Sequence, residues 1–107
     1  MTFHKDLSQG RWFTLSLAEQ LGNAGSELNR AISWKNRGDN SKFNAALERF
    51  FELMDLTLAD PRWTGARRRE LARVREQAGE ELYRPGGPRL DLQKYFDQFV
   101  ILARYKK

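Results

Sequence analysis

The stretch that decides the fold runs from Phe13 to Asn36 and reads FTLSLAEQLGNAGSELNRAISWKN. Its apolar residues recur every three or four positions: Leu17, Leu21, Ala24, Leu28, Ala31 and Ile32. This spacing places them on one face of a long amphipathic helix. Gly38 follows two positions later and suits the left-handed backbone that commonly ends a helix. The pattern therefore predicts one helix over residues 13–36.

A second helix is predicted over residues 42–59, with Asn40 or Ser41 as its cap and Asp60-Pro61 after its end. Its apolar residues are Phe43, Ala46, Leu47, Phe50, Phe51, Leu53, Met54 and Leu58. At 100° per residue they span an arc of roughly 160°, which is wider than a single-face stripe. This helix must therefore be covered from two sides.

Two more helices are expected, over residues 65–83 and 91–105, separated by the loop Arg84–Arg89. Thr64 and Asp91 are their expected caps, and an alternative start at Pro61 stays open for the first of them. The inward residues are expected to be Leu71, Val74, Ala78 and Leu82 in one, and Tyr95, Phe96, Phe99, Val100, Leu102 and Ala103 in the other. With no strand-like alternation, the chain predicts an all-α, up-down-up-down four-helix bundle.

The length, composition and charge of the chain limit the kinds of protein that it can be. The 107 residues suit one domain, expected over residues 11–107 after a flexible tail at residues 1–10. There is no cysteine, which excludes disulfides and thiolate chemistry. No apolar run has the length of a membrane span, and the first residues lack a signal-peptide core. We therefore expect a cytoplasmic protein that does not use a membrane. The net charge of +5 and the pI near 9.9 favour acidic partners.

Two groups of residues on the first helix are candidate sites. The polar flank consists of Gln20, Asn23, Glu27, Arg30 and Trp34, which share one side of the helix beside the apolar stripe. Three interpretations stay open for it: a buried network, a dimer seam or a polar ligand site. The small-residue stripe consists of Ala18, Gly22, Gly25 and Asn29. Its glycines favour close packing of another helix, with a ligand groove as the alternative.

Arg67, Arg68 and Arg69 form a candidate anion-binding site at the start of the third helix. Cations there oppose the helix dipole, whereas a phosphate would meet both the arginines and the free amides of the first turn. The alternative is a solvated face, in which Arg73 pairs with Glu70 and Glu76 along the helix.

Nothing in the chain predicts catalysis. His4 is the only histidine, and it lies in the expected N-terminal tail. A nucleophilic serine therefore lacks its usual histidine base, and a histidine-based metal site lacks a second histidine. Glu48, Glu52 and Asp55 lack the Glu-x-x-His pattern of carboxylate-bridged metal sites, so we interpret them as a solvated acidic face. No phosphate-binding glycine loop occurs. We therefore expect no enzyme activity, no metal and no cofactor.

Two segments, Arg11–Trp34 (RWFTLSLAEQLGNAGSELNRAISW) and Phe50–Pro61 (FFELMDLTLADP), resemble a small family of uncharacterised microbial helical proteins. No activity is associated with that family, so the resemblance implies no site residues. The chain is more loosely similar to the HEPN four-helix domains that accompany nucleotidyltransferases and toxin–antitoxin pairs. Catalytic HEPN domains carry an Arg-x4–6-His motif. That motif is absent here because no arginine precedes His4.

Two functions are therefore expected from the sequence. The first is a non-catalytic helical interaction module that forms a homodimer, through the Trp34 side of the first helix or a spare face of the second, where Leu56 lies outside the main arc. A second protein is a further possible partner. The alternative is a basic, HEPN-like accessory domain that binds nucleic acid or a nucleotide.

The predicted core generates the first testable expectation. Leu28→Ala or Phe50→Ala should lower the free energy of unfolding by roughly 2–5 kcal/mol, because each leaves a cavity between helices. Urea unfolding followed by circular dichroism measures this change. A loss below about 1 kcal/mol at both positions would show that these residues do not share the core.

Overall fold

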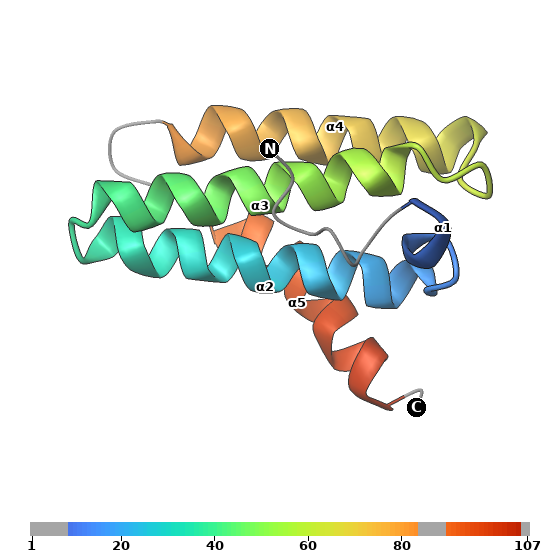
Figure 1. Cartoon of the computed structure of the whole chain (residues 1–107), viewed down its shortest axis with the longest axis horizontal. Coiled ribbons are helices and arrows are strands. Elements are labelled where there is room, and N and C mark those ends of the chain that lie inside the picture. Colours follow the sequence, from blue (N-terminus) through green and yellow to red (C-terminus); the bar gives the residue numbers. More distant parts are fainter. Residues whose placement is uncertain (1–8, 84–89, 106–107) are drawn as a thin grey trace.

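The computed structural model describes residues 9–83 and 90–105, and all regular structure within them is helical (Figure 1). The helices are α1 (Gln9–Trp12), α2 (Leu17–Asn36), α3 (Asn40–Leu58), α4 (Gly65–Leu82) and α5 (Leu90–Tyr105). The predicted all-α class is confirmed. In these two segments, no helix combines the length and the apolar character that crossing a membrane requires.

The prediction of one continuous helix from Phe13 was wrong, because α2 begins at Leu17. Ser16 Oγ accepts the backbone N–H of Glu19 at 3.1 Å, and the Glu19 carboxylate accepts the N–H of Ser16 at 3.0 Å. This reciprocal capping box satisfies first-turn donors and starts a new helix. The chain before it turns back from the short α1. Residues 9 and 10 of the expected tail belong to α1, and residues 1–8 lie outside the described structure.

The other helix ends depend on local capping. Asp39 caps α3 by accepting the N–H of Lys42 at 3.0 Å, so the helix begins at Asn40, and the predicted caps Asn40 and Ser41 were wrong. Gly38 has φ of 76°, as expected for a residue after a helix end. α4 begins at Gly65 as predicted, although Thr64 makes no side-chain capping bond among the described residues.

The fourth predicted helix is α5, which begins at Leu90, one residue before the expected cap at Asp91. The expected loop over residues 84–89 lies outside the described structure. Phe96 is fully buried as predicted, but Leu102 is 42% exposed, so its expected inward position was wrong. Six residues from Phe96 amount to about 240° around a helix, which turns Leu102 away from the core.

The helices α2, α3 and α4 lie side by side and alternate in direction, while α5 crosses α2 obliquely (Figure 1). α2 packs most closely against α3 and α5, and α4 covers another side of α3. The wide apolar arc of α3 is thus covered from two sides, as predicted. The six residues predicted for the core are all buried: Leu21, Leu28, Phe43, Leu47, Phe50 and Met54.

The small-residue stripe of α2 is the surface on which α5 lies. A Cβ on Gly25 would stand 2.7 Å from Phe96 Cβ, closer than real side chains approach. A Cβ on Gly22 would stand 3.4 Å from both Phe99 O and Val100 Cα. The buried Phe96 ring then meets the ring of Phe50 edge to face, with centroids 5.4 Å apart. The stripe serves close helix packing, the first of its two interpretations.

Gly25 and Gly79 offer a matched test of this close approach. Gly25→Ala should lower the free energy of unfolding by about 1–3 kcal/mol, because the added methyl overlaps Phe96 and pushes α5 away. Gly79→Ala should raise it by up to about 1 kcal/mol, because alanine favours a helix more than glycine does. A Cβ there would meet only the Phe51 ring, at an ordinary 3.5 Å.

Thermal or urea unfolding of the two variants beside the parent protein measures the difference. If Gly25→Ala proves as stable as Gly79→Ala, α5 does not depend on the absence of a side chain at Gly25.

Candidate functional site

The polar flank of α2 does not form one site. Gln20 and Glu27 are buried, Asn23 and Arg30 are exposed, and Trp34 is half-buried. Gln20 faces the α1 end of the molecule, whereas Glu27 faces the middle of α3. The flank is therefore divided between two separate hydrogen-bond clusters and a solvent-facing remainder.

Gln20 is the centre of a cluster that we call the clasp, which consists of the buried Trp12, Gln20, Thr57 and Asp60, the half-buried Trp63 and the exposed Arg62. The Gln20 Nε2 donates to the backbone carbonyl of Trp12 at 3.0 Å and to Asp60 Oδ2 at 2.9 Å. Its Oε1 accepts the indole N–H of Trp63 at 2.8 Å. One side-chain amide thus ties α1 and the α3–α4 connection to α2.

The second indole of the clasp is anchored in the same way. Trp12 is completely buried, and its Nε1 donates to Thr57 Oγ1 on α3 at 3.0 Å. The Thr57 hydroxyl in turn donates to the carbonyl of Leu53 at 2.8 Å. A buried indole N–H without an acceptor is costly, so Thr57 fixes where α1 can dock.

Asp60 and Arg62 form the charged part of the clasp. Asp60 is buried, and its carboxylate accepts from Arg62 Nη2 at 2.7 Å and from the Arg62 backbone N–H at 3.0 Å. The side-chain hydrogen bond from Arg62 is the main reason that the pKa of Asp60 falls from 3.8 to about 2, against the opposing effect of burial. The guanidinium also donates to the carbonyl of Leu15 and lies 4.6 Å from the Trp63 ring centroid.

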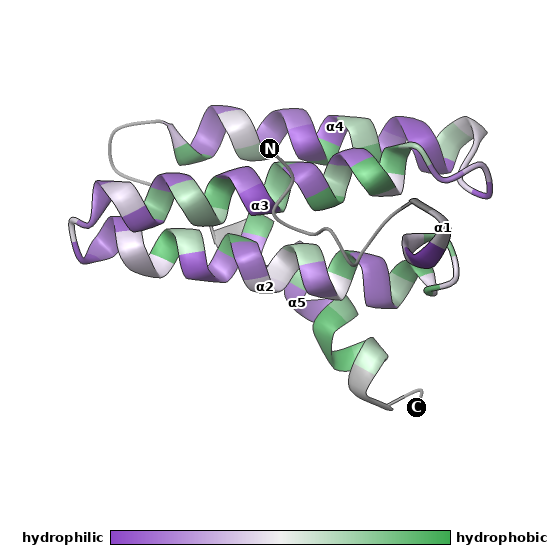
Figure 2. Ribbon diagram, viewed as in Figure 1, coloured by the Kyte–Doolittle hydropathy of each residue, from purple (hydrophilic) through white to green (hydrophobic). Residues whose placement is uncertain are grey.

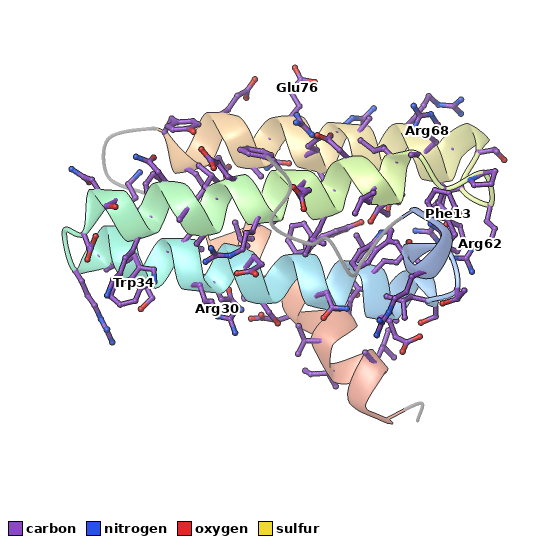
Figure 3. The ribbon with its side chains drawn as sticks, in the orientation of Figure 1. Phe13, Arg30, Trp34, Arg62, Arg68 and Glu76 are labelled. Atoms are coloured by element: carbon purple, nitrogen blue, oxygen red, sulfur yellow. The ribbon has the colours of Figure 1, made fainter. Side chains whose placement is uncertain are left out.

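The clasp is therefore a closed network. Its buried donors and acceptors meet partners from the same chain, and the arginine that reaches it from the surface neutralises its only carboxylate. Figure 3 shows Arg62 close to Phe13, at the end of the molecule where α1 docks. These groups join segments that are distant in sequence, and their geometry is that of a structural joint.

Glu27 forms the second cluster. Its buried carboxylate accepts from Arg30 Nη1 at 3.1 Å and from Arg49 Nε at 3.2 Å, so it links α2 to α3. At the far end of α2, the half-buried Trp34 has Lys42 Nζ 4.3 Å from its ring centroid and the Arg37 guanidinium carbon at 5.2 Å. Gln20 and Glu27 of the polar flank thus belong to hydrogen-bond networks within the chain, and the Trp34 ring makes cation–π contacts with basic residues of the same chain.

The arginines at the start of α4 have different surroundings. Arg67 pairs with Glu70 at 3.0 Å, and Arg68 Nη1 donates to the carbonyl of Leu58 at 2.7 Å. Arg69 is exposed. Glu70 also accepts the Tyr95 hydroxyl at 2.8 Å, which links α4 to α5 and, with burial as the larger cause, raises the pKa of Tyr95. An anion site at these arginines stays a prediction.

The predicted ion pairs of Arg73 with Glu70 and Glu76 do not form among the described residues. Glu70 meets Arg67 and Tyr95 instead, so the solvated face and the anion site both stay predictions.

The acidic residues of α3 do not form a metal site. Glu48 is exposed, and Asp55 forms an ion pair with Arg75 of α4 at 2.6 Å. Within residues 9–83 and 90–105, no cluster of histidines and acids is arranged to hold a metal ion. His4 lies outside these segments.

One apolar surface at the end of α5 was not predicted from the sequence. The C-terminal end of α5 extends beyond α2, away from α3 and α4, and this part of the helix is largely apolar (Figures 1 and 2). Ile101 is 54% exposed and Leu102 is 42% exposed, whereas Val100 is half-buried. The angular offset of Ile101 and Leu102 from Phe96 would have revealed this face in the sequence, because neither lies on the same side of the helix.

No protein-family model, curated protein or solved structure matches this chain. The likeness to HEPN domains thus stays an expectation from the sequence.

The clasp generates a pH-dependent prediction. The pKa of Asp60 is about 2 in the folded chain and 3.8 ordinarily, so folding favours its ionised form. The resulting stabilisation is complete above about pH 4 and is lost as the pH falls toward 2. Asp60→Asn should lower the free energy of unfolding by about 2 kcal/mol at neutral pH, and its difference from the parent should shrink over that window.

Denaturant unfolding of both proteins at several pH values between 2 and 7 tests this linkage. Asp55→Asn is the matched control, because it removes an exposed ion pair with Arg75 and should cost no more than about 1 kcal/mol. A pH-independent deficit in Asp60→Asn would mean that its carboxylate charge is not what stabilises the clasp.

Proposed function

We propose that this protein is a non-catalytic interaction module that self-associates, built as an up-down-up-down four-helix bundle from α2 to α5 with α1 docked at one end. The alternation of α2, α3 and α4 supports the bundle, as does the insertion of Phe96 of α5 against Phe50. The lack of a catalytic role is supported by the clasp and by Glu27, because these buried polar groups are occupied by partners within the chain.

The apolar end of α5 carries this proposal. Ile101 and Leu102 are both exposed, and they lie on the end of α5 that extends from the body of the molecule (Figure 1). In a two-fold contact between two α5 helices, these two side chains of each copy would be buried against the other copy. Removing such apolar surface from water is the main driving force of protein association.

This choice moves the dimer surface from the two locations expected from the sequence. α4 covers α3 on its second side, and Leu56 packs against the core. Trp34 is approached by Lys42 and Arg37 of its own chain. Neither surface offers an apolar face comparable with that of Ile101 and Leu102.

The nucleic-acid alternative has less support in the described fold. The chain carries a net charge of +5, which favours an acidic partner, but a net charge does not by itself mark one binding face. Arg67 and Arg68 also have partners within the chain. An electrostatic footprint for a phosphate backbone needs a stronger excess of cations on one face.

Self-association through α5 can be tested at the two exposed residues. The parent protein should be a dimer by light scattering at tens of micromolar, and Ile101→Ser with Leu102→Ser should weaken dimerisation by about 100-fold or more. Its circular dichroism spectrum should be unchanged, because neither side chain belongs to the core.

Tyr83→Ser is the control. Among the residues whose exposure the structure describes, Tyr83 is the most exposed large apolar one, at 65%, but it lies at the end of α4. This variant should keep the parent's dimerisation. A monomeric parent, or equal weakening by Tyr83→Ser, would contradict the proposal.

A further inference from the structure

The outward side of α4 carries four charged residues that we call the ridge: Arg69, Arg73, Glu76 and Glu80. All four are exposed, and at 100° per residue they fall within about 60° of one another. They lie opposite the buried stripe of α4, and Figure 3 shows Glu76 projecting away from the other helices. The ridge therefore faces solvent along most of the helix.

The order of charges along the ridge is unfavourable for α4 itself. Arg69 and Arg73 lie toward the N-terminus and Glu76 and Glu80 toward the C-terminus, so each pair sets like charges at four-residue spacing, which disfavours a helix. Glu80, in the last turn, also opposes the helix dipole. In the described part of the chain, none of the four has an ion-pair partner. By contrast, the off-ridge Arg75 is paired with Asp55. Within the ridge, the helix itself offers one favourable spacing, between Arg73 and Glu76 three residues apart.

When two α4 helices lie antiparallel with their ridges facing each other, positive charges of one copy lie opposite negative charges of the other. A two-fold axis between residues 74 and 75 places Arg69 opposite Glu80, because both are equally distant from the axis. The same axis places Arg73 opposite Glu76. A parallel arrangement would instead set like charges against each other. The exposed Ala72 beside the ridge adds little bulk to such a contact.

We propose that α4 binds α4 of a second copy of this chain in antiparallel orientation, through these two kinds of ion pair, each formed twice. Exposed ion pairs are individually weak and are screened by salt, so this contact is favoured at low ionic strength. It goes beyond self-association through α5, because it uses a different surface and a different force. The two contacts are therefore separable by their response to salt.

The experiment starts from the variant Ile101→Ser with Leu102→Ser, so that α5 does not contribute. Sedimentation equilibrium at about 1 mM protein in roughly 20 mM salt should detect dimers, and raising the salt to about 0.5 M should weaken them at least tenfold. Two charge variants are then made in this background. One carries Arg69→Glu with Arg73→Glu, and the other carries Glu76→Arg with Glu80→Arg.

Each charge variant alone should be monomeric, because every pair across the axis becomes repulsive. An equimolar mixture of the two should form a heterodimer at least as stable as the parent contact, because every pair is attractive again. Arg11→Glu with Lys94→Glu is the control, since it changes the net charge as much as the first variant does but away from the ridge. This control should dimerise as its background does.

Three results would overturn the proposal: no dimer in 20 mM salt, a mixture that associates no better than its separate components, or a control that loses dimers as fully as the ridge variants do. Circular dichroism of each variant shows whether α4 is intact. A monomeric parent whose α5 variant also fails to dimerise at low salt would refute both contacts, whereas salt-sensitive dimers in the α5 variant would support the ridge alone.

Discussion

The close approach of α5 to α2 at Gly25 is the constraint on which the core depends. Because Gly25 has no side chain, the Cβ of Phe96 can occupy the space that another residue would fill. This places the Phe96 ring against Phe50 and so joins α5 to α3 through α2. Two glycines within α2 weaken its intrinsic helix propensity, and the packing of α5 offsets that cost.

The clasp also joins separate helices, near the N-terminal end of α2, but it does so through polar groups instead of apolar packing. There the joint is polar: two indoles, one amide and one ion pair connect α1, α2 and the α3–α4 connection. A buried polar network holds a structure well only when every member has a partner, and the bonds of Gln20 meet that condition. The hydrogen-bonding groups of Gln20 are thus bonded within the protein instead of being available to a ligand.

Two surfaces remain after these internal joints are formed, and they differ in character. The end of α5 is apolar and projects from the body, whereas the ridge of α4 is charged and self-complementary. Burial of apolar surface supplies most of the free energy of a protein interface, and charge complementarity supplies orientation and selectivity. Together they are the two surfaces on which the proposed self-association rests.

The sequence alone determined the helical class and most of the core, because the apolar spacing of a helix is a local property that needs no knowledge of neighbours. The six predicted core residues, the stripe of α4 and the break after Gly38 were readable in this way. The break at Ser16 was also local, since its signature is the Glu three residues later.

Only the tertiary structure decided how the polar residues are used. Gln20 and Asp60 are 40 residues apart, and nothing in local spacing brings them within 2.9 Å. The exposure of the ridge likewise depends on which side of α4 meets α3. A pattern along the chain states which side chains share a face, but only the packing of helices decides whether that face meets protein or water.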